Sequence, residues 1–179
     1  MAQTFLNLAQ GVTGTLPTSN YVQGGITMAD NWKITSGATG TNAPLTNNWV
    51  RVSSTGIGTI GSAMTQSSGV FTFPSTGIYQ ITFMAYLEGN DDSRYNTINI
   101  YGTINNSSYS AIAESSQFIQ QTQSNAGYGG VMCSSNFDVT DTSNCKVRFH
   151  YTPSTSNIIL IGASSYTATH VMFTRLGDT

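Results

Sequence analysis

The sequence predicts an all-β protein whose strands form a sandwich or a jelly roll. Charged residues make up only 8% of the chain, against about 25% in an ordinary soluble protein. Serine, threonine and asparagine fill the difference, and with 18 glycines and 9 tyrosines they are typical of strands and turns. From Ile26 onward, short runs of alternating apolar and polar residues are separated by turn clusters about every 8 to 14 residues, which is the spacing of an all-β domain.

Residues 1–25 differ from the rest of the chain. They carry glycine, proline, threonine and asparagine without a helical or long alternating pattern. Such a segment cannot form a core of its own, so we expect an extended N-terminal attachment segment that docks on a partner. Residues 26–179 are expected to form one head domain, with strands near residues 26–36, 48–54, 57–64, 69–73, 77–88, 95–104, 108–120, 127–139, 145–152, 157–162 and 166–176.

The strands expected near 77–88 and 145–152 show which side chains point inward, because alternate residues of a strand share a face. Each has an aromatic row, and four members of these rows are expected in the core or at a subunit interface: Tyr79, Phe83, Phe149 and Tyr151. The opposite row of the first strand is apolar too, since it contains Ile78, Met84 and Tyr86. With so few charges in the chain, we expect another subunit to cover that second face, which predicts a homotrimer.

Charge and hydropathy exclude two classes of partner. The net charge is −2, and the six basic residues form no stripe that could neutralise a phosphate backbone, so nucleic-acid binding is not expected. No run of about 18 apolar residues occurs, and the first residues lack the basic region of a signal peptide. We therefore expect neither membrane insertion nor secretion.

Two apparent catalytic motifs have an ordinary structural explanation. Residues 56–61 spell G-x-G-x-x-G, but the dinucleotide fingerprint needs a following helix, and a second turn and strand are expected here. His150 and His170 have no nearby carboxylate in the sequence, and no G-x-S-x-G elbow is present. We expect no enzyme activity and no cofactor, and a hydrolase, as an esterase or depolymerase, remains only the third hypothesis.

One loop gathers charge in a chain otherwise nearly free of it. It is the candidate surface contact, formed by Glu88, Asn90, Asp91, Asp92 and Arg94. Its oxygens are closely spaced, as calcium requires, but the order of a calcium-binding loop is absent. A solvated turn is the simpler explanation, and a contact with a host receptor or glycan is the functional one.

The two cysteines are expected to be free and buried. Cys133 and Cys145 lack the spacing of a zinc site or redox pair. We expect them on two strands joined as a hairpin through residues 141–144, which would leave them too far out of register for an unstrained disulfide.

Residues 69–81 resemble a known family. They follow the order G-x-F-x-x-P-x-x-G-x-Y-x-[FI], with Phe71, Pro74, Gly77 and Tyr79 at the matching positions. This order is similar to the centre of the complement-q and tumour necrosis factor superfamily, and residues 137–149 resemble its late hairpin, with Ser143 and Asn144 in place of the usual Gly-Asp. The resemblance implies a ten-stranded jelly-roll sandwich that forms trimers and catalyses no reaction.

The attachment segment carries a second resemblance. Residues 8–17, L-A-Q-G-V-T-G-T-L-P, followed by Asn20 and Gly24-Gly25, are similar to a segment common in phage tail and fibre proteins. The ending at residues 173–178 resembles virion proteins with complement-q-like heads. Together these imply a trimeric phage virion structural protein, a fibre knob, capsid decoration or host-contact module, joined to other virion proteins through residues 1–25 and assembled in the host cytoplasm. The alternative from another class is a secreted complement-like adhesin or lectin.

Overall fold

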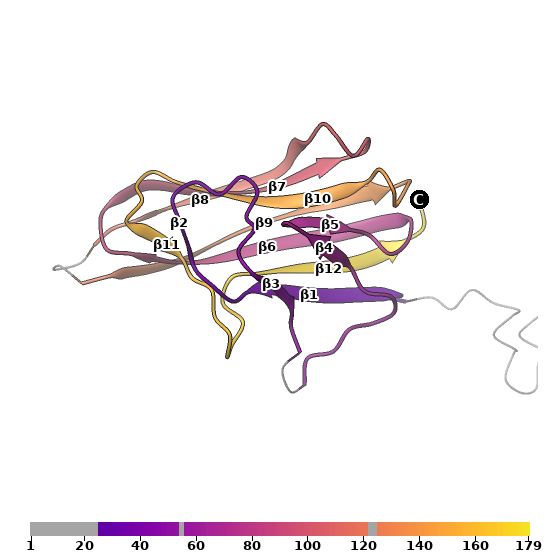
Figure 1. Ribbon diagram of the computed structural model, residues 1–179, viewed down its shortest axis with the longest axis horizontal. Coiled ribbons are helices and arrows are strands. Elements are labelled where there is room, and N and C mark those ends of the chain that lie inside the picture. Colours follow the sequence, from indigo (N-terminus) through magenta and orange to yellow (C-terminus); the bar gives the residue numbers. More distant parts are fainter. Residues whose placement is uncertain (1–24, 54–55, 122–124) are drawn as a thin grey trace, which may run out of the picture.

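The computed structural model describes residues 25–53, 56–121 and 125–179, and these form two antiparallel sheets packed face to face (Figure 1). The strands are β1 (Met28–Ile34), β2 (Ala38–Thr39), β3 (Trp49–Arg51), β4 (Thr65–Ser67), β5 (Val70–Thr72), β6 (Gly77–Gly89), β7 (Ser93–Thr103), β8 (Ser110–Ile119), β9 (Gly127–Val139), β10 (Lys146–Pro153), β11 (Ile158–Leu160) and β12 (His170–Gly177). The all-β sandwich prediction is confirmed. The predicted attachment segment lies outside the described residues except for Gly25.

The larger sheet has seven strands in the order β2-β11-β6-β12-β1-β3, with β9 along the other edge of β6. The smaller sheet has five strands in the order β4-β5-β10-β7-β8. No helix long and apolar enough to cross a membrane occurs in the described part of the chain.

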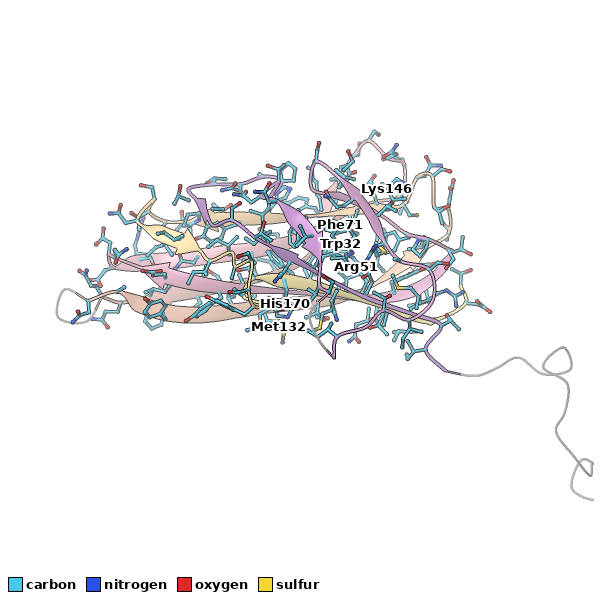
Figure 2. The ribbon with its side chains drawn as sticks, turned by 60° about the horizontal axis from the view of Figure 1, so that its bottom comes forward. Trp32, Arg51, Phe71, Met132, Lys146 and His170 are labelled. Carbon is cyan, nitrogen blue, oxygen red and sulfur yellow. The ribbon has the colours of Figure 1, made fainter. Side chains whose placement is uncertain are left out.

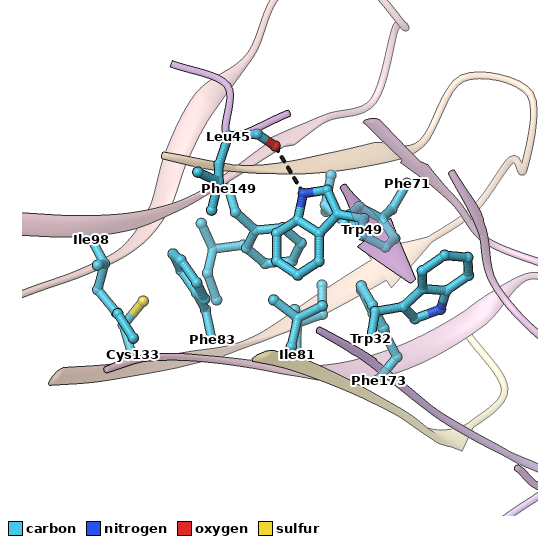
Figure 3. Close-up of a cluster of buried hydrophobic side chains, with 14 of the residues drawn as sticks. Trp32, Leu45, Trp49, Phe71, Ile81, Phe83, Ile98, Cys133, Phe149 and Phe173 are labelled. Atoms are coloured by element: carbon cyan, nitrogen blue, oxygen red, sulfur yellow. Dashed lines mark hydrogen bonds between the residues drawn. The ribbon is translucent and has the colours of Figure 1, made fainter. Parts of the chain in front are cut away.

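The core between the sheets is built from aromatic side chains of both (Figure 3). The ring of Phe71 on β5 lies at its centre, with ring centroids 5.5 Å from Trp32, 5.3 Å from Trp49 and 5.4 Å from Phe149. All three contacts are edge-to-face, the favoured aromatic geometry, and the neighbouring Trp49–Phe149 pair is tilted. The indole N–H of Trp49 donates to the carbonyl of Leu45 at 2.8 Å, so this buried polar group is satisfied.

In the motif at residues 69–81, Gly77 is needed because another segment of the same chain passes close to it. Gly77 has a φ of 136°, and a Cβ there would lie 2.5 Å from the Arg175 side chain and from the carbonyl oxygen of Gly177. Two residues later, the buried Tyr79 donates its hydroxyl to the carbonyl of Ser75 at 3.0 Å. The motif therefore fixes the entry into β6 and serves the fold.

The observed strands differ from the sequence expectations in three places. The strand expected near 57–64 is absent: Ile60 makes one isolated bridge to Ala29, and the regular strand is β4 at Thr65–Ser67. Gly61, with a φ of 64° and its Cα close to the carbonyl of Thr27, interrupts the run. The short strand β2 was not expected at all.

The third difference concerns the hairpin that was expected to join the strands of Cys133 and Cys145 through residues 141–144. β9 pairs with β6 along its whole length, whereas β10 pairs with β5 and β7 in the other sheet. The turn at 141–144 thus connects the two sheets and does not close a hairpin. Cys133 and Cys145 are both free and buried, as expected, but Cys133 lies on β9 and Cys145 directly precedes β10 of the other sheet.

Candidate functional site

The four aromatic residues expected in the core or at an interface lie inside a single chain. Tyr79, Phe83, Phe149 and Tyr151 have no exposed surface. Phe83 and Phe149 face each other across the sandwich with ring centroids 5.0 Å apart. The Tyr151 hydroxyl donates to the carbonyl of Ile158, and burial raises its pKa. None of the four offers surface to a second subunit, so a trimer needs other residues at its interface.

The charged loop is tied into the fold by its own side chains. Asn90, Asp91 and Asp92 lie exposed in the turn between β6 and β7. Asp92 accepts a hydrogen bond from the backbone N–H of Gln121 at 2.7 Å, and Asp91 accepts one from the Asn157 amide at 3.2 Å. These carboxylates join the end of β8 and the turn before β11 to the loop, so they have a structural role whether or not they contact a partner.

The remaining two members of the predicted contact lie on different sheets. Glu88 lies near the end of β6 in the seven-stranded sheet, opposite Tyr128 and Ile159. Arg94 is exposed near the start of β7 in the five-stranded sheet. Among the described residues, no group of three or more histidine, cysteine, aspartate or glutamate side chains is placed to hold a metal ion.

The fold does not bring the two histidines together. His150 lies on β10 and His170 on β12, in different sheets. Within the described residues neither has a carboxylate hydrogen-bond partner, and the Nδ1 of His170 lies 2.9 Å from the carbonyl oxygen of Ala168. The G-x-G-x-x-G run leads into strand β4, so the helix that a dinucleotide site requires does not follow it.

The outer surface of the seven-stranded sheet carries an exposed apolar patch, which we call the methionine face. It consists of Met84, Tyr86, Tyr128, Met132 and Met172. Met84, Met132 and Met172 are 37%, 59% and 39% exposed, and they come from the three adjacent strands β6, β9 and β12. Figure 2 shows Met132 and His170 on one side of the sandwich, with Lys146 on the other.

Apolar side chains continue to the far edge of the same surface. The register of the paired strands places one row of residues across this surface. The row runs from Val50 through Lys33, His170 and Met84 to Met132. A shallow pocket of about 130 Å³ lies next to this row, lined by Asn31, Val52, Ile57, Thr167, His170 and Met172. Lys33 adds no free charge here, because it is 5% exposed and its Nζ donates to the carbonyls of Ser164 and Tyr166.

The outer surface of the five-stranded sheet has a different chemistry. There Tyr101, Tyr109, Arg148 and His150 form what we call the arginine cluster. The Arg148 Cζ lies 4.0 Å from the Tyr109 ring centroid and 5.8 Å from that of Tyr101. The Tyr101 ring stacks on His150 with centroids 4.0 Å apart.

A larger surface pocket lies near the start of β1. It has a volume of about 320 Å³ and is lined by Thr27, Met28, Ser62, Pro74, Ser75 and Arg175. The guanidinium of Arg175 is already engaged there by Thr27, by the carbonyl of Thr76 and by Asp178. The hydrogen-bond donors of Arg175 are therefore already engaged within the fold.

Sequence reasoning identified part of the methionine face and none of the arginine cluster. The outward row of β6, with Met84 and Tyr86, was visible from alternation within one strand. Met132 and Met172 show the same alternation in their own strands, but only the sheet order places the three methionines together. Tyr109 lies in the connection before β8, where no periodic pattern could assign it to Arg148.

Comparison with known proteins identifies the fold. No family model matches the chain, and no curated protein sequence matches it. Among solved structures, it resembles Eiger TNF from S. frugiperda, with a TM-score of 0.61, 12% identity, and coverage of 85% of this chain and 94% of that one. It also resembles murine APRIL at pH 5.0, with a TM-score of 0.60, 9% identity, and coverage of 83% and 98%. The chain therefore has a TNF-like jelly-roll fold.

Proposed function

We propose that this chain is a non-enzymatic structural and binding module that acts as a homotrimer on a phage virion. The observation that carries the trimer is the methionine face. Monomeric soluble proteins seldom expose contiguous large apolar patches, and methionine is common at surfaces that bind protein. The fold shared with Eiger TNF and APRIL supports a binding module.

The position of the apolar residues supports a ring. A closed trimer needs a heterologous interface, in which one surface of each subunit meets a different surface of the next. The methionine face offers apolar groups at both edges of its sheet, Met132 and Tyr128 on β9 and Val50 on β3. Contact between the β9 edge of one subunit and the β3 edge of the next would repeat around a threefold axis.

Light scattering of the purified chain tests the trimer. We expect a mass of about three times 19.1 kDa. Met132→Asp should shift the protein to monomer, because it places a charge in the apolar contact. Ile104→Asp is the matched control, since Ile104 is 71% exposed in the turn after β7, away from the methionine face. A wild-type chain that stays monomeric at micromolar concentration refutes the trimer.

The virion assignment rests on the sequence of the attachment segment and is tested separately. Mass spectrometry of purified particles should detect the chain. A version lacking residues 1–25 should fold and trimerise as before but fail to join particles. If the shortened chain is incorporated normally, residues 1–25 do not attach it. The loop from Glu88 to Arg94 stays our candidate for the host contact, and a particle with Asp91→Asn, Asp92→Asn and Arg94→Gln that adsorbs normally would exclude it.

A further inference from the structure

We propose that the arginine cluster binds the acid group of a charged polysaccharide, with the Arg148 guanidinium as the anchor. The site lies on the outer surface of the five-stranded sheet, where Arg148 pairs across strands with Tyr101. This proposal deepens the binding role given above, and it does not depend on trimer formation.

The first argument is the hydrogen-bonding state of Arg148. A guanidinium has five N–H donors and no acceptor. Within the described residues none of the Arg148 donors has a partner, and its Nε is fully buried without an acceptor. The Nε2 of His150 beside it is likewise buried and unpartnered. These two atoms are covered by the protein itself, whereas the two terminal nitrogens of Arg148 are not buried, so they are the donors that a ligand would contact.

The second argument is the contrast with the other cations of the chain apart from Arg94, which is exposed. Oxygen atoms of the protein already accept hydrogen bonds from Lys33, Arg51, Lys146 and Arg175. The nearest glutamate on this surface, Glu114 on β8, accepts a hydrogen bond from Asn99 at 2.6 Å and lies two strands from β10. Arg148 is therefore a cation on a sheet surface that has no oxygen partner among the described residues.

The third argument is preorganisation. Cation–π contact with Tyr109 and Tyr101 holds the planar guanidinium in place, so less side-chain entropy is lost when a ligand binds. Burial raises the pKa of Tyr109, against the opposing effect of the Arg148 charge. Burial, aided by the Arg148 charge, lowers the pKa of His150 to about 4. At neutral pH both groups are uncharged, and the positive charge of Arg148 is not cancelled.

These features fit a carboxylate or sulfate carried on a sugar. The guanidinium fork matches the paired oxygens of such groups, and charge-assisted pairs of this kind are the strong ones. Tyrosine presents an apolar ring and a polar tip, which suits the mixed surface of a sugar. Lys146 lies two residues along β10 from Arg148 and adds a second positive charge to the same strand.

Calorimetric titration of the full chain tests the proposal. The ligands are trigalacturonate for a carboxylate, a short sulfated dextran for a sulfate, and neutral dextran as the uncharged control. We expect binding to one or both acidic ligands and none to neutral dextran. Arg148→Gln should weaken binding at least tenfold, and Arg148→Lys should weaken it less because it keeps the charge but loses the fork. The matched control is Arg175→Gln, which removes a cation from β12 in the opposite sheet and should leave the affinity unchanged.

A second measurement tests the proposal even if the Arg148 variants do not fold. In wild-type protein, the NMR signal of the Arg148 Nε–H should shift on addition of the acidic ligand. Binding to neither acid, equal binding to neutral dextran, or equal weakening by Arg175→Gln would each overturn the proposal. A single trigalacturonate molecule is short and occupies one site at a time. Its binding to Arg148 is therefore measured independently of whether the protein forms a trimer, which light scattering tests.

Discussion

Replacement of Asp30 should destabilise the fold more than any surface change, because this carboxylate holds three segments together. Asp30 on β1 is 1% exposed. Its oxygens accept hydrogen bonds from the Trp32 indole at 2.9 Å, from Arg51 Nε at 3.0 Å and from the backbone N–H of Met64 at 2.9 Å. The carboxylate thus connects β1 to β3 and to the chain entering β4.

The loss of stability depends on which hydrogen-bond donors each substitution of Asp30 leaves unpaired. Asp30→Ala leaves the Trp32 and Met64 donors unpaired, at about 1–3 kcal/mol each. It also breaks an ion pair that is only half-buried, because the Arg51 side chain is 38% exposed. The total cost should be about 3–5 kcal/mol. For a domain of this size, about 1 kcal/mol corresponds to 2–4 °C, so the melting temperature should fall by about 6–20 °C. Asp30→Asn should cost less, because its single oxygen can replace Oδ2, which accepts from both Trp32 and Met64.

Urea denaturation followed by tryptophan fluorescence measures both variants. The control is Asp138→Ala, an exposed aspartate near the end of β9 that should change stability by less than about 1 kcal/mol. A loss below about 1 kcal/mol for Asp30→Ala would show that the carboxylate does not hold these segments together. An Asp30→Asn variant less stable than Asp30→Ala would refute the assignment of Oδ2 as the main acceptor.

Three further changes test other parts of the structure. Gly77→Ala should destabilise the fold by more than about 1 kcal/mol in the same assay, because φ is 136° and the Arg175 side chain fills the space; an unchanged midpoint would contradict this. The His150 pKa of about 4 lies below its ordinary 6.5, so its stabilising contribution is full above pH 6.5 and is lost as pH falls through 4. His150→Gln should therefore reduce the fall in stability between pH 6.5 and 4 by up to about 3 kcal/mol, and parallel pH profiles would refute it. Asp92→Ala should cost about 0.5–1 kcal/mol through the lost Gln121 hydrogen bond, and local hydrogen exchange at Gln121 should rise while other amides keep their protection.

The sequence predicted strands better than it predicted their partners. Alternation within a strand depends only on local side chains, so the inward row of β6 and its apolar outer row could be assigned. Pairing depends on contacts between distant segments. A turn of Asp, Thr, Ser and Asn at 141–144 is compatible with a hairpin, yet β9 is fully paired with β6 and β10 must join the other sheet.

The candidate sites depend even more on distant contacts. Asp30 looks like an ordinary polar residue of a strand until Arg51 and Met64 are brought to it. Arg148 lies in an alternating strand, but the tyrosine that covers it comes from the connection between β7 and β8. No local pattern reports that this cation lacks an oxygen partner.

The two outer surfaces differ in chemistry, and this difference suits the assembly and the recognition that we propose. The methionine face keeps its central cation, Lys33, closed off by two carbonyls, which leaves a surface suited to burial against another subunit. The arginine cluster lies on the opposite sheet, so a trimer built through the methionine face would leave Arg148 of each subunit accessible. Three weak sites on one rigid head can bind a repeating acidic polymer about 10²–10⁴ times more tightly than a short oligosaccharide, without any new contact. The low charge of the chain is consistent with this arrangement, because an attraction from a few placed cations needs no general excess of positive charge and avoids non-specific binding to other polyanions.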